Sequence, residues 1–285
     1  MILQERFEDL TRFMGQISAY PQVQVALFGM PMDFTVSYHP GSRFGPAAIR
    51  EASWGLEDWS PLSGGELANI RYTDLGDIIM PSGNTHLALE RIGEVAEQIL
   101  SDNVIPFGFG GDHLVSLPVI KAVYKKYPDL RVVHLDAHAD LRAEYAGETH
   151  THATVMGRVV DFLGADRLYQ FGIRSGTKEE FARAQHLFSD VRLIADHLET
   201  LEKYPIYVSM DIDVVDPAFA PGTGTQEPGG ATSREILEAT GQLGQLQVVG
   251  FDLVEVLPQL DYSGRTAALA AKVVREMLCA LALKS

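Results

Sequence analysis

The chain has 285 residues, of which 46% are hydrophobic and 21% charged, and these proportions are ordinary for a soluble globular protein with a large buried core. A net charge of −15 argues against nucleic acid as a partner, and no apolar run is long enough to cross a bilayer, which argues against a membrane protein. Cys279 is the only cysteine, which excludes an intrachain disulfide, and the N-terminus lacks a signal peptide, so we expect a cytoplasmic location.

Short apolar segments alternate with helical patterns along the whole length, which predicts one domain over residues 1–285. Several of the segments are β-branched or aromatic without polar alternation, as is typical of strands buried on both faces of a parallel sheet. In chain order, the predicted strands are Val23–Phe28, Ile70–Asp74, Val104–Phe109, Val132–Leu135, Leu168–Phe171, Val191–Leu193, Ile206–Met210 and Val248–Phe251. One predicted helix starts near Asn84 or Thr85. Three further helices are predicted over residues 114–124, 233–243 and 266–283.

Strand–helix alternation implies right-handed crossovers and therefore an α/β fold with a mostly parallel sheet. A closed (β/α)8 barrel shows similar alternation and is the alternative fold. Ligands of open parallel sheets bind beyond the carboxyl ends of the strands, so polar residues at those ends are the candidates for a site.

Two turn-rich loops interrupt the alternation. The loop 39–46 leads into a helix that we expect to start at Pro46 or Ala47, and an irregular loop follows Asp216 as far as Gly230. Loops at the carboxyl ends of strands commonly shape a substrate pocket, although both could also be rigid connections.

Three predicted strands are followed directly by potential metal ligands. Two carboxylates and an imidazole at alternate positions after Leu135 would share one face at the end of an extended strand. Such ligands suit Mn, Fe, Zn or Mg, and four carboxylates with two imidazoles suit two cations about 3.5–4 Å apart. The three strand ends together provide His113, Asp136, His138, Asp140, Asp211 and Asp213.

The same segments resemble the ureohydrolase family, which includes arginase and agmatinase. The resemblance covers most of the chain and is carried by Gly-Gly-Asp-His at 110–113, Asp-Ala-His-Ala-Asp at 136–140, Ser-Met-Asp-Ile-Asp-Val-Val-Asp-Pro at 209–217 and Gly-Phe-Asp-Leu-Val-Glu-Val at 250–256. The segments 40–46, 140–142 and 171–176 are similar to those of bacterial agmatinases.

The resemblance implies a three-layer α/β/α sandwich, a binuclear centre with two Mn²⁺ per chain, and a homotrimer or homohexamer. It implies that His113 would bind one ion and His138 the other, while four aspartates supply the remaining ligands. Glu255 occupies the position of the guanidinium-binding glutamate and His152 that of the proton-transfer histidine, with His150 as its rival. The remaining implied ligands are Asp136, Asp140, Asp211 and Asp213.

Other roles stay open for some of these residues. Glu255 could pair with an arginine at a strand end, and His152 could cap a helix that starts near Ala153. We expect no direct metal ligation by His134, Asp216 or Asp252.

The implied reaction converts a guanidine, namely agmatine, to urea and putrescine, a step of polyamine synthesis. The ammonium end of agmatine could meet Glu144 or Glu148, whereas Arg142 in the pocket would favour a carboxylate tail such as that of guanidinobutyrate. The alternatives are a guanidinobutyrase or arginase-like enzyme, a metal-dependent amide deacetylase, and a non-catalytic scaffold.

Overall fold

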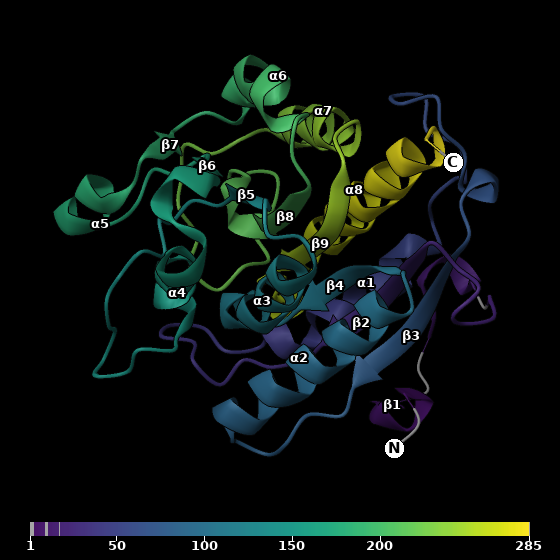
Figure 1. The fold of residues 1–285 in the computed structure, drawn as a ribbon, viewed down its shortest axis with the longest axis horizontal. Coiled ribbons are helices and arrows are strands. Elements are labelled where there is room, and N and C mark those ends of the chain that lie inside the picture. The colour runs from purple at the N-terminus through teal and green to yellow at the C-terminus, as the bar shows by residue number, and fades with distance from the viewer. Residues whose placement is uncertain (1–2, 9–10, 17, 285) are drawn as a thin grey trace.

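A computed structural model describes residues 3–8, 11–16 and 18–284. A nine-stranded sheet runs through it in the order β1-β3-β2-β4-β9-β8-β5-β6-β7 (Figure 1). The antiparallel strand β1 pairs with β3 at one edge, and every other pairing is parallel. The strands are β1 Phe7–Glu8, β2 Val25–Met30, β3 Tyr72–Ile78, β4 Ile105–Gly110, β5 Arg131–Leu135, β6 Leu168–Phe171, β7 His186–Phe188, β8 Ile206–Asp211 and β9 Val248–Val254.

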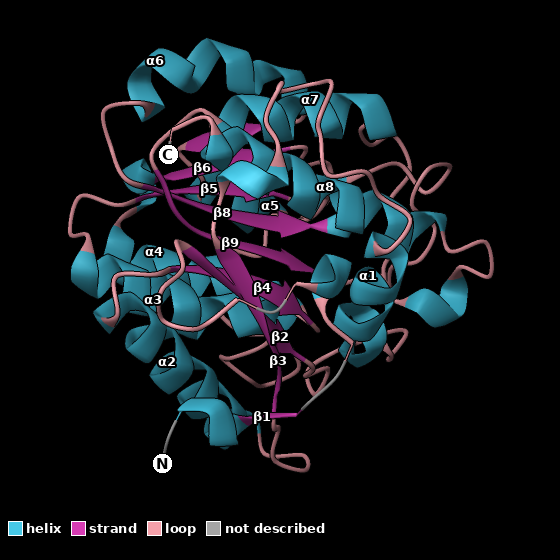
Figure 2. Ribbon diagram, turned by 90° about the vertical axis from the view of Figure 1, so that its right-hand side faces the viewer, coloured by secondary structure: helices cyan, strands magenta, loops and turns pink. Residues whose placement is uncertain are grey.

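Helices cover both faces of the sheet, so the protein is a three-layer α/β/α sandwich (Figure 2). The helices α2, α3 and α4 pack on one face, and α1, α7 and α8 pack on the other. The helices are α1 Gly45–Ser53, α2 Thr85–Ser101, α3 Ser116–Lys126, α4 Val155–Leu163, α5 Lys178–Arg183, α6 Leu198–Leu201, α7 Ser233–Gly244 and α8 Arg265–Ala282. Because β1 and β7 are the two edges of an open sheet, the barrel alternative is wrong.

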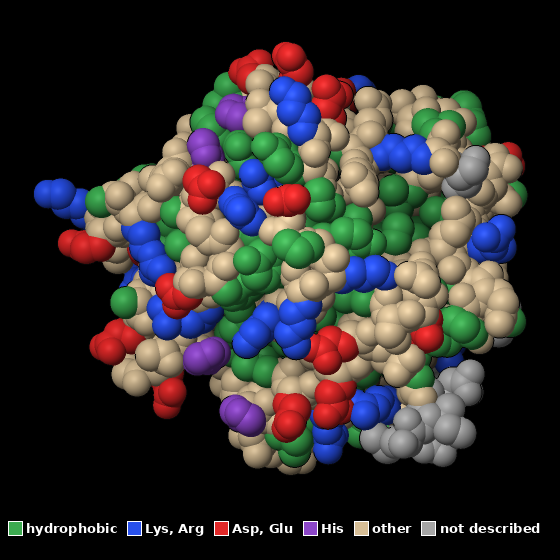
Figure 3. Space-filling view, in the orientation of Figure 1, with side chains coloured by type: hydrophobic (Ala, Val, Ile, Leu, Met, Phe, Trp, Pro, Cys, Tyr) green, Lys and Arg blue, Asp and Glu red, His purple; other side chains and the backbone are tan. Residues whose placement is uncertain are grey.

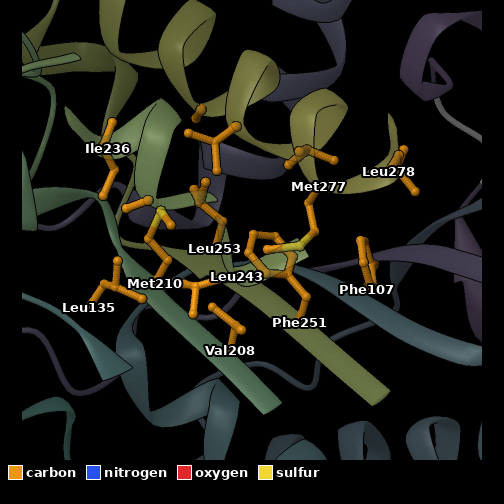
Figure 4. Close-up of a cluster of buried hydrophobic side chains, with 14 of the residues drawn as sticks. Phe107, Leu135, Val208, Met210, Ile236, Leu243, Phe251, Leu253, Met277 and Leu278 are labelled. Atoms are coloured by element: carbon orange, nitrogen blue, oxygen red, sulfur yellow. The ribbon is translucent and has the colours of Figure 1, made fainter. Parts of the chain in front are cut away.

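Two hydrophobic cores fill the spaces between the layers. Alternate residues of a strand enter opposite cores: Val25 and Leu27 face the α1, α7 and α8 layer, while Ala26 and Phe28 face the α2, α3 and α4 layer. Figure 4 shows the first of these cores, where side chains of the central strands meet side chains of α7 and α8. Burial on both faces explains why these strands lack polar alternation in the sequence.

One predicted strand is wrong. The residues Val191–Leu193 lie in a short 3-10 helix, Val191–His197, and the edge strand is β7 instead. The Asp190 side chain caps this helix by accepting a hydrogen bond of 2.8 Å from the backbone N–H of Arg192. The apolar residues there pack as a helical turn, and all three residues of β7 are only half-buried, so the apolar pattern marked the wrong segment.

The outer surface carries charges of both signs. On the face seen in Figure 3, acidic and basic side chains are interspersed rather than separated. Among the described residues, no helix has the length and apolar character needed to cross a membrane.

Candidate active site

Four adjacent strands end at one place on the carboxyl edge of the sheet. They are β4, β9, β8 and β5, in that spatial order, and each delivers a polar residue at or just after its end. The β4 segment leads to His113 in the 3-10 turn His113–Val115, and β9 leads to Glu255. Asp211 is the last residue of β8, and Asp136 directly follows β5. The parallel topology therefore brings residues far apart in sequence to one site.

The His113 imidazole lies among three carboxylates. Its Nδ1 atom is 3.0 Å from Asp136 Oδ2, 3.3 Å from Asp140 Oδ2 and 3.4 Å from Asp211 Oδ2. Among the described residues, none forms a hydrogen bond of proper geometry with this buried nitrogen, although three acceptors surround it. A nitrogen lone pair and three carboxylate oxygens directed at one point fit a divalent cation, which would satisfy all four atoms together.

A second group of ligands adjoins the first. His138 Nδ1 is 2.9 Å from Asp213 Oδ2 and 3.5 Å from Asp136 Oδ1. Asp136 therefore directs one oxygen to each imidazole, which is the arrangement expected of a carboxylate shared by two cations. All six predicted metal ligands are brought together in these two groups.

The carboxylates of the cluster destabilise one another when no cation is present. Burial, together with the Asp136 charge, raises the pKa of Asp140 to about 7. Burial and neighbouring carboxylates likewise raise the pKa of Asp211 well above its usual range. Burial lowers the pKa of His113, but contacts with three aspartates outweigh it and raise that pKa well above its usual value. Added positive charge, such as a bound cation, would therefore stabilise the ionised carboxylates of the cluster.

The convergence around Asp136 does not come from an extended strand. The strand β5 ends at Leu135, and the residues that follow are irregular, with Asp140 in the left-handed region at φ 54°. Asp213 likewise lies in the 3-10 turn Ile212–Val214 rather than in β8. The predicted alternation of side chains is thus wrong in its geometry, although the residues do meet.

A second layer of hydrogen-bonded side chains holds the candidate ligands in place. Ser209 Oγ is 3.0 Å from His113 Nε2 and donates to Asp252 Oδ1 at 2.7 Å, while Tyr207 donates to the other oxygen of Asp252. His134 Nε2 is 2.8 Å from Asp136 Oδ2. The structure thus places Asp252 and His134 against side chains of the site, where they can fix the orientation of a ligand.

Glu255 adopts an unusual backbone conformation next to this cluster. Its φ is 62°, its N–H donates to Gly111 O at 2.9 Å, and its Oε1 accepts from the N–H of His113 at 3.0 Å. Burial and the Asp112 charge raise the pKa of the carboxyl well above its usual range. Within the part of the chain that the structure describes, no arginine pairs with Glu255, so its second oxygen is available to a ligand.

His152 and His150 occupy different environments. His152 Nδ1 lies 2.7 Å from the carbonyl of Thr35, and because a carbonyl only accepts, Nδ1 carries the proton and Nε2 keeps its lone pair. Burial lowers the pKa of His152. His150 instead lines a separate cavity beside α2 and α3. The helix cap at this point is Thr151, so the alternative of His152 as that cap is wrong.

A cavity of about 300 Å³ opens over the cluster. Glu255, His152 and Arg142 line it together with five of the six predicted ligands. Arg142 Nε is 3.5 Å from Glu180 Oε2, and its guanidinium lies 5.0 Å from the centre of the Tyr145 ring. The described residues that line the cavity do not include Glu144, which is exposed.

The sequence alone did not identify several residues of this lining. Glu227 and Thr225 come from the irregular loop after Asp216, whose position after a strand was the available signal. Ser37, whose Oγ is 3.3 Å from His152 Nε2, belongs to no recognisable motif.

Comparison with known proteins gives a consistent result. The model of the Arginase family matches residues 23–280. An agmatinase of Bacillus anthracis is 48% identical over 274 residues, which are 93% of this chain and 94% of that protein. A guanidinobutyrase of Pseudomonas aeruginosa is 36% identical over 276 residues, 91% of this chain and 86% of that protein. The solved structure of an agmatine ureohydrolase of Thermoplasma volcanium superimposes with a TM-score of 0.86 at 33% identity, covering 96% of this chain and 94% of that chain.

The chain belongs to the arginase family. The fold agrees with this assignment, and polar residues from the ends of four strands lie together at the carboxyl edge of the sheet. Within the family, the protein is a ureohydrolase of the agmatinase type.

Proposed function

We propose that this enzyme hydrolyses agmatine to urea and putrescine at a binuclear manganese centre. The observation that carries the proposal is the pair of ligand groups sharing Asp136, beside a half-buried glutamate, Glu255, whose second oxygen has no partner among the described residues. Relatives named agmatinase, 46–48% identical over most of the chain, support agmatine as the substrate.

The first ion would be held by His113 and the second by His138, with the aspartates of the two groups as the other ligands. Mixed imidazole and carboxylate ligation suits Mn²⁺. Bound there, two divalent cations supply the Lewis acidity that makes water a competent nucleophile near neutral pH.

The protein itself orients the substrate through Glu255. A guanidinium carbon is a poor electrophile because resonance delocalises its charge, so the reaction depends on accurate positioning. Glu255 Oε1 is already engaged by the N–H of His113, which fixes the carboxylate and leaves Oε2 for the planar guanidinium. The fixed carboxylate directs the guanidinium carbon toward the cluster.

The leaving amine must gain a proton before the C–N bond breaks, and we assign this transfer to His152. Its Nδ1–H is committed to Thr35, so Nε2 is the atom that takes up and delivers the proton. His152 lines the same cavity as Glu255, whereas His150 does not.

We further propose that the enzyme is cytoplasmic, forms a single domain over residues 1–285, and assembles as a homotrimer or homohexamer. The single sheet formed by strands from Phe7 to Val254 supports the one-domain organisation. The resemblance to the ureohydrolase family supports the assembly, which size-exclusion chromatography with light scattering would measure.

The proposed reaction can be tested by urea release. Purified protein loaded with Mn²⁺ is given agmatine, arginine, 4-guanidinobutyrate and 3-guanidinopropionate separately at equal concentration. We expect urea mainly from agmatine and about two bound metal ions per chain. Urea mainly from a carboxylate-bearing guanidine would keep the chemistry and reject agmatine, and a single zinc per chain without urea would favour a deacetylase.

A further inference from the structure

The cavity contains more carboxylates than two divalent cations and one substrate guanidinium would neutralise. Two divalent cations would neutralise the four aspartates of the cluster, and Glu255 would then pair with the substrate guanidinium. Three other charged side chains line the same cavity, and their own contacts decide which of them can act on the rest of the substrate. They are Arg142, Glu180 and Glu227.

Two of these three charges neutralise each other. The Arg142 Nε lies 3.5 Å from Glu180 Oε2, and the arginine also stacks over Tyr145. Both oxygens of Glu180 are occupied, because Oε1 accepts from the N–H of Leu141 at 3.0 Å and Oε2 accepts from the N–H of Thr177 at 2.8 Å. This pair therefore adds no net charge to the cavity.

Glu227 is the remaining charge. In residues 3–8, 11–16 and 18–284, no lysine, arginine or histidine side chain pairs with its carboxylate. Its backbone is nevertheless fixed, because Arg174 donates to Glu227 O from Nη2 at 2.6 Å and from Nε at 3.1 Å. The same guanidinium donates to Asp213 O at 2.7 Å, which ties the Glu227 loop to the segment carrying a ligand of the cluster.

We propose that Glu227 binds the cationic tail of the substrate and selects a guanidine that ends in an ammonium over one that ends in a carboxylate. The inference rests on the proposed function, since it concerns the tail of the same substrate. Agmatine carries two positive charges, and two glutamates that line the cavity, Glu255 and Glu227, have no salt-bridge partner among the described residues. A carboxylate tail would instead meet the like charge of Glu227.

The test compares three guanidines of similar length: agmatine, the uncharged-tail butylguanidine, and 4-guanidinobutyrate. We expect Glu227→Gln to lower kcat/KM for agmatine about 10- to 100-fold, mostly through KM, because a charge-assisted hydrogen bond is lost. Hydrolysis of butylguanidine should change less than about threefold, since that substrate makes no such bond. Glu227→Lys should shift the preference toward 4-guanidinobutyrate.

The control is Glu202→Gln, which removes an exposed carboxylate outside the cavity lining. Metal content of each variant is measured, and all should match the wild type. An equal loss for agmatine and butylguanidine, or no loss for either, would overturn the role of Glu227 while leaving the proposed reaction intact.

A binding measurement separates the two proposals if turnover fails. Calorimetry compares 1,4-diaminobutane with butylamine on the Mn²⁺-loaded protein. Glu227→Gln should reduce the affinity for the diamine about 10-fold or more and leave the monoamine unchanged. Absence of urea from every guanidine would reject the proposed function alone, and equal effects on both amines would reject the tail site.

Discussion

His134 offers a sharp test of how the protein prepares its metal site. The Gln170 amide nitrogen donates to the carbonyl of Ala139 at 2.7 Å and lies 3.0 Å from His134 Nδ1. An amide nitrogen only donates, so Nδ1 accepts and the imidazole proton resides on Nε2. Burial lowers the pKa of His134, which keeps the ring neutral. The Nε2–H therefore donates to Asp136 Oδ2 at 2.8 Å.

We predict that His134→Phe weakens Mn²⁺ binding while preserving the fold. The variant removes one buried hydrogen bond to the carboxylate shared by both ligand groups, worth roughly 1.5–3 kcal/mol. That loss corresponds to about a 10- to 150-fold lower affinity, in the range found for residues that orient metal ligands. Gln170→Met should cause a smaller loss, because it frees the tautomer of His134 but retains the ring.

The assay is calorimetric titration of metal-depleted protein with Mn²⁺, together with metal analysis after dialysis. His186→Phe is the matched control, because His186 is also a histidine in the sheet but stacks on Tyr169 in β6. Thermal unfolding of the metal-free proteins checks that each variant folds. Unchanged Mn²⁺ affinity in a folded His134→Phe protein would refute the argument that this hydrogen bond prepares Asp136.

Four further predictions concern single residues. Asp136→Ala or Asp213→Ala should lose metal and nearly all turnover, and full metal occupancy with full activity would contradict the ligand assignment. Glu255→Gln should keep its metal but lose turnover about 100-fold or more, because only the substrate clamp changes; loss of metal would make Glu255 a ligand. His152→Gln should lower kcat about 10²- to 10⁴-fold with little change in KM, as measured by urea release. Burial raises the pKa of Cys279 to about 11, so this thiol should react with Ellman's reagent only after unfolding.

The apolar pattern predicted most of the sheet because its central strands are buried on both faces. It did not predict β1, whose two residues form an antiparallel edge, or β7, whose residues are half-buried. At Val191, local capping by Asp190 outweighed the strand preference of the sequence. An edge strand forms where its backbone can pair with a neighbouring strand, and the hydropathy of a segment does not indicate whether such a neighbour exists.

The sequence predicted the residues at the strand ends of the candidate site but not those of the cavity wall. His113, Asp136 and Asp211 lie at or just after the ends of strands, so the parallel topology brings them together. The cavity wall depends instead on where loops fold back. Glu144 lies near the ligands in sequence yet is exposed, whereas Glu227 lines the cavity from a distant loop. The position of the Glu227 loop after a strand indicates that it can reach the pocket, but the sequence does not specify the path of the loop.

The backbone of Glu255 has an evolutionary consequence. A glutamate at φ 62° holds a backbone conformation that costs of order 1–3 kcal/mol for a residue other than glycine, and glycine would adopt it without strain. Selection for thermal stability alone would therefore favour replacing this residue, and the replacement would lack the carboxylate assigned to the substrate. Directed evolution of a heat-resistant variant thus needs a simultaneous screen for turnover, because stability favours glycine at this position whereas turnover requires the glutamate.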